Sequence, residues 1–201
     1  MNDAICDNNW DFRKVFAVCV GLGLAFQVGH FAEHAIQFAV WVSGTYQWVA
    51  TTFCGRDTPY MSPPLTRMVQ IAGALLFPGS SPARQMMLGM ELLHLMGNAI
   101  FLATIAGVYY FCPSKWVRYA FCLEGGHMCE HLALTATALF VGKPIGISTV
   151  FGQAVYWLGQ EGAVGYRVTW HFAMNLFPMP FVMIGMMRHD WARPPALAAA
   201  A

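Results

Sequence analysis

Four long runs of apolar residues follow one another along the chain, separated by segments rich in glycine, proline and charged residues. About 20 consecutive apolar residues in a helix cross the hydrocarbon core of a bilayer, and each run reaches that length. The pattern therefore predicts four transmembrane helices, at residues 12–42, 82–111, 115–141 and 166–187.

Start and stop signals support these limits. Ser43-Gly44 ends the first run, and Ser81-Pro82 begins the second with serine as the cap and proline at the first helical position. Pro113 separates the second run from the third, and Gly142-Lys143-Pro144 ends the third. The chain should therefore pass back and forth as an up-and-down bundle.

Two shorter apolar stretches lie between these runs, around residues 66–77 and 150–158. They are too short to span a bilayer, so we expect short interfacial helices in the two loops that contain them. Positive charges near the span ends set the orientation, because the cytoplasmic side carries the excess of lysine and arginine. One side would hold Arg13, Lys14, Lys115, Arg118 and Arg188, and the other Arg67, Arg84, Lys143 and Arg167. Both termini are therefore predicted to be cytoplasmic, with both loops outside.

Composition agrees with a membrane protein. Hydrophobic residues make up 57% of the chain and charged residues only 10%, whereas about 25% of the residues in ordinary soluble domains are charged. The basic residues form no cluster dense enough to bind nucleic acid. We expect one domain over residues 1–201: an all-α, integral membrane four-helix bundle that contacts the lipid bilayer.

A repeated polar motif interrupts two of the apolar runs. The pattern H-x-x-E-H occurs at His30–His34 and again at His127–His131. Its two histidines and its glutamate share one helix face. Ionised groups at the centre of a membrane helix cost roughly 2.5–3.5 kcal/mol, so they mark candidate functional sites. Superposing the copies also aligns Thr51-Thr52 with Ser148-Thr149 and Gly55 with Gly152, which suggests two duplicated helix pairs.

The other two runs carry polar stripes as well. Glu91, His94 and Asn98 share a face of the second run, and His171 and Asn175 share a face of the fourth. Counted from the outer ends of the helices, the stripes fall at similar depths and should meet in one layer.

Histidine and carboxylate side chains that converge in a helical bundle are typical of a metal site. The predicted ligands are His30, Glu33, His34, Glu91, His94, His127, Glu130, His131 and His171. Around them we expect supporting contacts from Gln27, Gln37, Asn98, Glu124 and Asn175. This set exceeds the needs of one ion and predicts two metal ions, iron first and zinc, copper or manganese as alternatives. Glu33 and Glu130 could act as ligands or as catalytic bases.

A dinuclear non-haem site in a bundle suggests a membrane oxidoreductase, an oxidase or oxygenase acting on a lipophilic small-molecule substrate with an electron donor. Three alternatives stay open at this point. The same groups could form the pathway of a metal-ion or proton transporter, and two histidines could ligate a b-type haem. A zinc-dependent intramembrane hydrolase would use Glu33 or Glu130 as its base.

Overall fold

The computed structural model describes residues 8–49 and 58–189, with side chains from Phe12 onward. This part of the chain is all-α, as predicted, and its only β-type pairing is one isolated bridge between Val49 and Thr58. The elements are α1 (Asn8–Ser43), α2 (Pro63–Leu76), α3 (Pro82–Phe111), α4 (Lys115–Phe140), the short 3₁₀ helix η1 (Ile147–Thr149), α5 (Ala154–Leu176) and α6 (Pro178–Met187).

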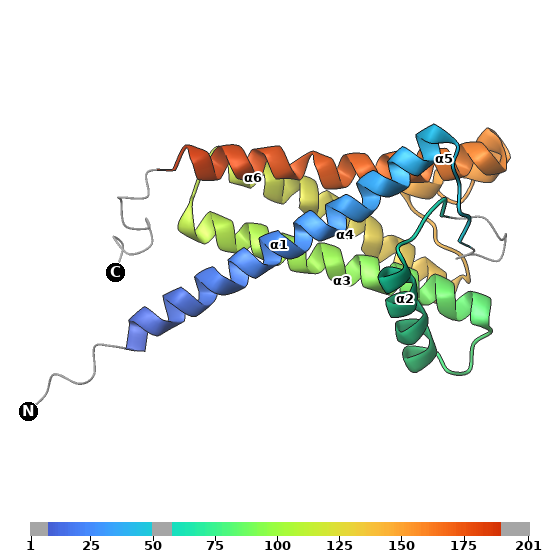
Figure 1. Ribbon diagram of the computed structural model, residues 1–201, viewed down its shortest axis with the longest axis horizontal. Coiled ribbons are helices and arrows are strands. Elements are labelled where there is room, and N and C mark those ends of the chain that lie inside the picture. Colours follow the sequence, from blue (N-terminus) through green and yellow to red (C-terminus); the bar gives the residue numbers. More distant parts are fainter. Residues whose placement is uncertain (1–7, 50–57, 190–201) are drawn as a thin grey trace, which may run out of the picture.

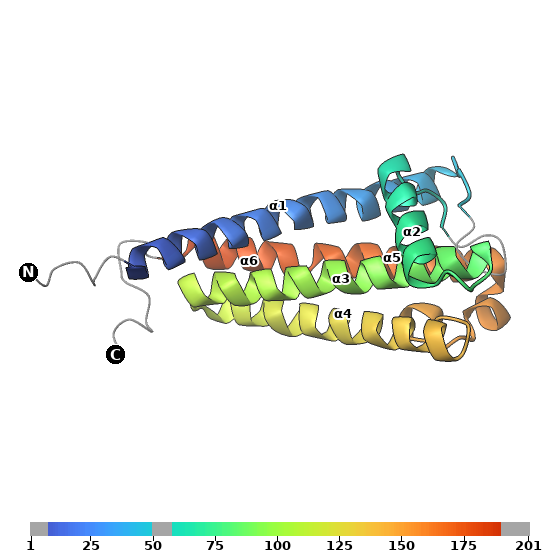
Figure 2. The same cartoon turned by 90° about the horizontal axis from the view of Figure 1, so that it is seen from below.

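The long helices lie side by side in an elongated bundle (Figure 1). α1 crosses the others at an angle, α3 and α4 run antiparallel, and α5 and α6 follow one another along a single line. Figure 2 shows α2 running transverse to α3 at one end of the bundle. The start of α1, the turn between α3 and α4 and the end of α6 all lie at the opposite end.

Helix limits match the sequence analysis closely, except in the last element. The Ser81 side chain accepts a hydrogen bond from Arg84 N, and the Ser114 side chain accepts one from Val117 N, so both serines cap the helices that follow them. α5 begins earlier than expected and contains a non-helical residue at Gly159, with φ 72°. The fourth predicted segment therefore consists of the later part of α5 together with α6.

Different contacts stabilise the two ends of the bundle. Near the α3–α4 turn, an apolar cluster includes Phe101, Ile105, Val117 and Val182, all nearly inaccessible. At the other end, α2 packs closely on α3. A Cβ on Gly73 would lie 2.1 Å from Gln85 O, and one on Gly89 would lie 2.3 Å from Val69 O, so the two helices require glycine where they touch.

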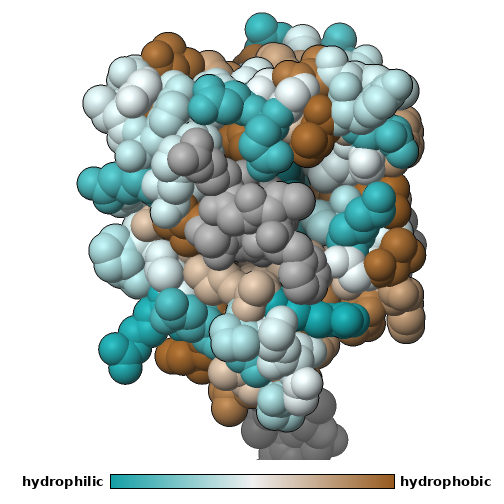
Figure 3. All heavy atoms as spheres, turned by 90° about the vertical axis from the view of Figure 1, so that its right-hand side faces the viewer, coloured by the Kyte–Doolittle hydropathy of each residue, from teal (hydrophilic) through white to brown (hydrophobic). Residues whose placement is uncertain are grey.

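Two helices among the described residues, Phe12–Ser43 and Pro82–Phe111, are long and apolar enough to cross a membrane. Figure 3 looks onto the end of the molecule that carries the loops, where hydrophilic residues, in teal, lie among paler and apolar ones.

Candidate metal centre

Six histidines from four helices gather in the half of the bundle nearer the loops. Neighbouring rings lie 4.8–6.2 Å apart between centroids, so the rings form one continuous cluster. The members are His30 and His34 from α1, His94 from α3, His127 and His131 from α4, and His171 from α5. The structure thus brings together every histidine that the sequence analysis proposed as a ligand.

The cluster divides into two groups of three. The first histidine group is His30, His34 and His94, and the second histidine group is His127, His131 and His171. Within each group, one candidate ligand atom per residue lies within 4.8 Å of the others. Each group comes from one pair of helices, α1 with α3 or α4 with α5.

Two histidines of each group face one another across a single helical turn. The Nε2 atoms of His30 and His34 are 3.1 Å apart, and those of His127 and His131 are also 3.1 Å apart. Metal–imidazole bonds are about 2.0–2.1 Å long, so two nitrogens on one ion at 90–109° lie roughly 2.8–3.4 Å apart. A direct hydrogen bond between two histidines would give a similar distance between the Nε2 atoms. Such a bond would not account for the third histidine beside each pair, whereas a metal ion would.

The third histidine of each group is oriented by its own helix. His94 Nδ1 lies 2.9 Å from the Met90 carbonyl oxygen, and His171 Nδ1 lies 2.8 Å from the Arg167 carbonyl oxygen. A carbonyl only accepts hydrogen bonds, so Nδ1 carries the proton and Nε2 keeps its lone pair. This tautomer is the one that a metal-binding histidine needs.

Two asparagines extend the same pattern. Asn98 Nδ2 donates to the His94 carbonyl over 2.8 Å, and Asn175 Nδ2 donates to the His171 carbonyl over 2.9 Å. α3 and α5 share the sequence pattern H-x-x-x-N, just as α1 and α4 share G-H-x-x-E-H. These matched contacts support the predicted duplication, whereas its further match at Thr51, Thr52 and Gly55 falls outside the described residues.

The glutamates of the repeated motif bind the loops. Glu33 Oε1 accepts a hydrogen bond from Ser62 N over 2.7 Å, at the start of α2. Glu130 accepts one from Ile147 N over 2.8 Å and one from Ser148 N over 2.7 Å, at the start of η1. Both carboxylates thus cap the helix in the loop that follows their own helix. The sequence analysis did not predict these hydrogen bonds between the glutamates and the loops.

Glu91 also has a partner. Its Oε1 forms an ion pair with Arg167 NH2 across α3 and α5, and Glu91 Oε2 has no partner among the described residues. The sequence analysis treated Arg167 only as a flanking charge. Its position four residues before His171 places it on the same helix face, and this spacing was the available signal.

The remaining predicted supporting residues lie around the histidines. Gln27 Nε2 donates to Asn175 Oδ1 over 3.0 Å, and Glu124 Oε2 lies 3.4 Å from His127 Nδ1. Gln37 borders a cavity of about 30 Å³ that is also lined by His34, His94, His171 and Arg167. This cavity touches both histidine groups and is large enough for one water-sized molecule.

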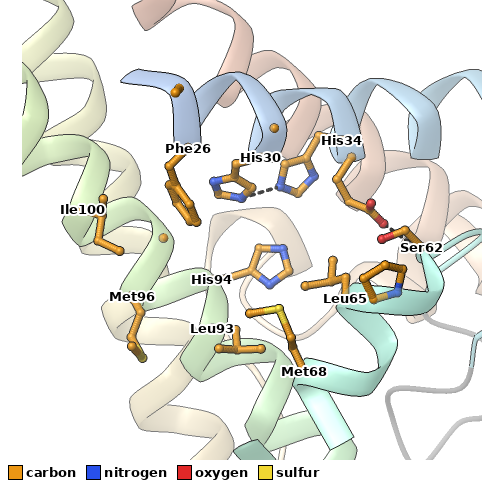
Figure 4. A pocket seen from close by; sticks show the side chains of 15 residues that line it. Phe26, His30, His34, Ser62, Leu65, Met68, Leu93, His94, Met96 and Ile100 are labelled. Atoms are coloured by element: carbon orange, nitrogen blue, oxygen red, sulfur yellow. Dashed lines mark hydrogen bonds between the residues drawn. The ribbon is translucent and has the colours of Figure 1, made fainter. Parts of the chain in front are cut away.

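A larger cavity opens beside the first histidine group (Figure 4). It has a volume of about 490 Å³ and lies between α1, α2 and α3. His30, His34 and His94 border it, and the apolar side chains around them include Phe26, Leu65, Met68, Leu93, Met96 and Ile100. No histidine of the second group lines this cavity.

The chain belongs to DUF6008, a family of unknown function whose model matches residues 5–200. No curated protein and no solved structure matches it.

Proposed function

We propose that this DUF6008 protein is an integral membrane oxidoreductase that holds two metal ions, one in each histidine group, and oxidises a lipophilic substrate. The observation that carries the proposal is the paired geometry: twice, two Nε2 atoms lie 3.1 Å apart beside a third histidine whose Nδ1 is bound to a backbone carbonyl. A chance packing of histidines would not repeat this arrangement on two helix pairs.

The proposal includes four membrane-spanning segments with both termini in the cytoplasm. Beyond the two apolar helices, α4 exposes Tyr119, Phe121, Leu132 and Leu139, as expected of a helix that faces lipid. Arg188 and Lys115 lie over the Trp116 ring, at 5.4 and 5.3 Å from its centroid. Tryptophan and basic residues together are typical of a cytoplasmic membrane interface.

The donor set determines which metals we expect. Iron was favoured by a mixture of carboxylates and histidines, but Glu33 and Glu130 bind loop amides and Glu91 pairs with Arg167. Three neutral imidazoles per ion suit copper, zinc and iron, and copper binds most tightly in the general order of divalent metals. We therefore favour copper, with iron as the alternative for the same redox chemistry.

Dioxygen is the proposed electron acceptor. Dehydrogenation of the substrate would supply two electrons and reduce dioxygen to hydrogen peroxide, whereas insertion of one oxygen atom into the substrate, with the other reduced to water, would need two further electrons from a donor. Redox-active ions would supply the electron transfer. The chain would supply their ligands and an apolar place for the substrate. The 30 Å³ cavity between the groups, bordered by the Arg167 side chain, provides room for a small polar molecule.

Three observations favour this proposal over the alternatives. A transport path would continue beyond the histidines, where the bundle instead contains the buried cluster of Phe101, Ile105 and Val117. A haem would need room between the histidine rings, which already lie 4.8–6.2 Å apart. A hydrolase would need a free general base, and Glu33 and Glu130 accept backbone hydrogen bonds.

Elemental analysis and redox spectroscopy test the proposal together. We expect two copper or iron ions per chain after purification without chelators, and an absorption spectrum that changes with dithionite and returns in air. His189→Ala, which lies outside the cluster, should keep both ions. Two zinc ions with no redox-dependent spectrum would reject the oxidoreductase, and one ion or none would reject the dinuclear site.

A further inference from the structure

The 490 Å³ cavity opens sideways from the bundle, toward the surface on which apolar side chains are exposed. Its rim includes Phe26, Met68, Met96 and Ile100, whose exposed fractions are 45%, 54%, 50% and 42%. They come from α1, α2 and α3, so the opening lies between three helices. A molecule dissolved in the bilayer could enter here without crossing the polar loops.

The lining of the cavity selects against charge. No lysine or arginine is among its described lining residues, and its single carboxylate, Glu33, accepts a hydrogen bond from Ser62 N. The other polar groups are the serine and the three histidines of the first histidine group. An anionic ligand would find no counter-ion there, and a cationic ligand would find only the Glu33 carboxylate, which already accepts the Ser62 hydrogen bond. Burying an unpaired charge is costly. The volume falls within the range of about 300–1,000 Å³ that is usual for small-molecule sites.

We infer that this cavity binds an uncharged, lipophilic molecule that enters from the bilayer and reacts only at the first histidine group. This inference deepens the proposed function and rests on it for the reaction, although binding itself requires only the cavity. The second histidine group, all of whose members are buried, would then have no direct contact with the substrate.

Two glycines in equivalent positions provide a matched test. Gly29 precedes His30 and lines the cavity, whereas Gly126 precedes His127 on α4 and does not. A Cβ on either glycine would have no neighbour within 4 Å, so neither backbone position excludes a larger side chain at its first carbon. Gly29→Leu should partly fill the cavity, and Gly126→Leu should leave it open.

Photolabelling in detergent with an uncharged long-chain alcohol that carries a diazirine would measure binding. We expect mass spectrometry to find the label on the cavity residues Met68, Met96 and Ile100. Gly29→Leu should reduce this labelling about tenfold, equivalent to about 1.4 kcal/mol of binding free energy, and Gly126→Leu should not change it. A sulfonate analogue of the same chain length should label these residues poorly, because the cavity has no lysine or arginine among its described lining residues.

Ala25→Leu is a second variant that narrows the same cavity, in case Gly29→Leu does not fold. Labelling should persist in protein stripped of metal with a chelator, so a failure of the metal proposal would not remove it. Labelling of Leu132 and Leu139 on α4 as strongly as the cavity residues would overturn the inference. Equal labelling by the charged analogue, or no loss in both cavity variants, would also overturn it.

Discussion

The two histidine groups share a ligand pattern but differ in their surroundings. In the first histidine group, His30 and His94 are half-buried and border an open apolar cavity. In the second histidine group all three residues are buried, and Glu124 lies against His127. Gln27 lies three residues before His30, just as Glu124 lies three residues before His127. The Gln27 amide, however, donates to Asn175. The two histidine groups thus differ in access: the first borders an open cavity, and the second is buried.

This difference in surroundings would give two bound metal ions different affinities and different access to substrate. A carboxylate that holds the Nδ1–H of a ligand histidine raises the basicity of that ligand and strengthens metal binding. The second histidine group has such a carboxylate, and none of its members lines the 490 Å³ cavity. The first histidine group borders the 490 Å³ cavity, and the residue equivalent to Glu124 is Gln27, which has a neutral amide. We therefore propose that substrate reacts at the first group, while the second retains its ion more tightly and exchanges electrons with it.

Removing one ligand from either group should have the largest effect. His34→Ala and His131→Ala should each lose one of the two ions, because three histidines per ion leave no spare ligand. Each variant also leaves a buried partner nitrogen unpaired, which costs about 1–3 kcal/mol of unfolding free energy. Elemental analysis and thermal unfolding measure the two effects. Two retained ions in either variant would contradict the assignment of three histidines to each ion.

Changing the carboxylate beside His127 should have a smaller effect, confined to one group. Glu124→Gln should weaken the ion of the second histidine group roughly 10–100-fold and leave the first unchanged. Competition with a chelator of known affinity would resolve the two ions. Gln27→Ala is the matched variant in the first half and should change the first ion less. Full occupancy with abolished metal uptake into vesicles in Glu124→Gln would instead favour the transporter.

Periodicity in the sequence predicted which side chains share a helix face. The spacing of His30 and His34, and of His127 and His131, was enough to predict that they converge, because helix geometry fixes the positions of residues four apart. The helix start predicted at Ser81-Pro82 was equally local. These features depend on neighbours within one or two turns.

Contacts across the bundle could not be predicted in this way. Glu33 shares a face with the histidines, but its partner is Ser62, whose position depends on how α2 packs on α3. The pairing of Glu91 with Arg167 likewise joins residues of two helices far apart in sequence. The open cavity has the same origin, since α2 forms one wall of it. The difference in openness between the two histidine groups therefore arises from tertiary packing that the repeated motif does not encode, whereas the difference between Glu124 and Gln27 is visible in the sequence.

Neutralising the motif glutamates would distinguish a loop contact from a metal ligand. Glu33→Gln and Glu130→Gln should each keep two ions and lose stability, because hydrogen bonds to a charged group contribute about 1.5–3 kcal/mol each. Glu130→Gln should lose more, since Glu130 accepts two backbone hydrogen bonds and Glu33 one. Elemental analysis and chemical denaturation measure both quantities. Loss of an ion in either variant would restore the original prediction that these glutamates are ligands.

Gly97→Ala, beside the first histidine group, should have the smallest effect. A Cβ on Gly97 would lie 3.2 Å from His30 Cε1 and 3.4 Å from its Nδ1, so Gly97→Ala should displace the His30 ring by a few tenths of an ångström. Alanine stabilises a helix interior by roughly 1 kcal/mol relative to glycine, so unfolding measurements alone would obscure this displacement. Chelator competition should show a weaker ion in the first histidine group, an unchanged ion in the second, and a smaller loss than in Glu124→Gln. Gly125→Ala on α4 is the control, because its Cβ would meet no atom within 4 Å. Equal weakening of both ions in Gly97→Ala would mean that the two groups form a single coupled site, and the division between an open and a closed centre would then be wrong.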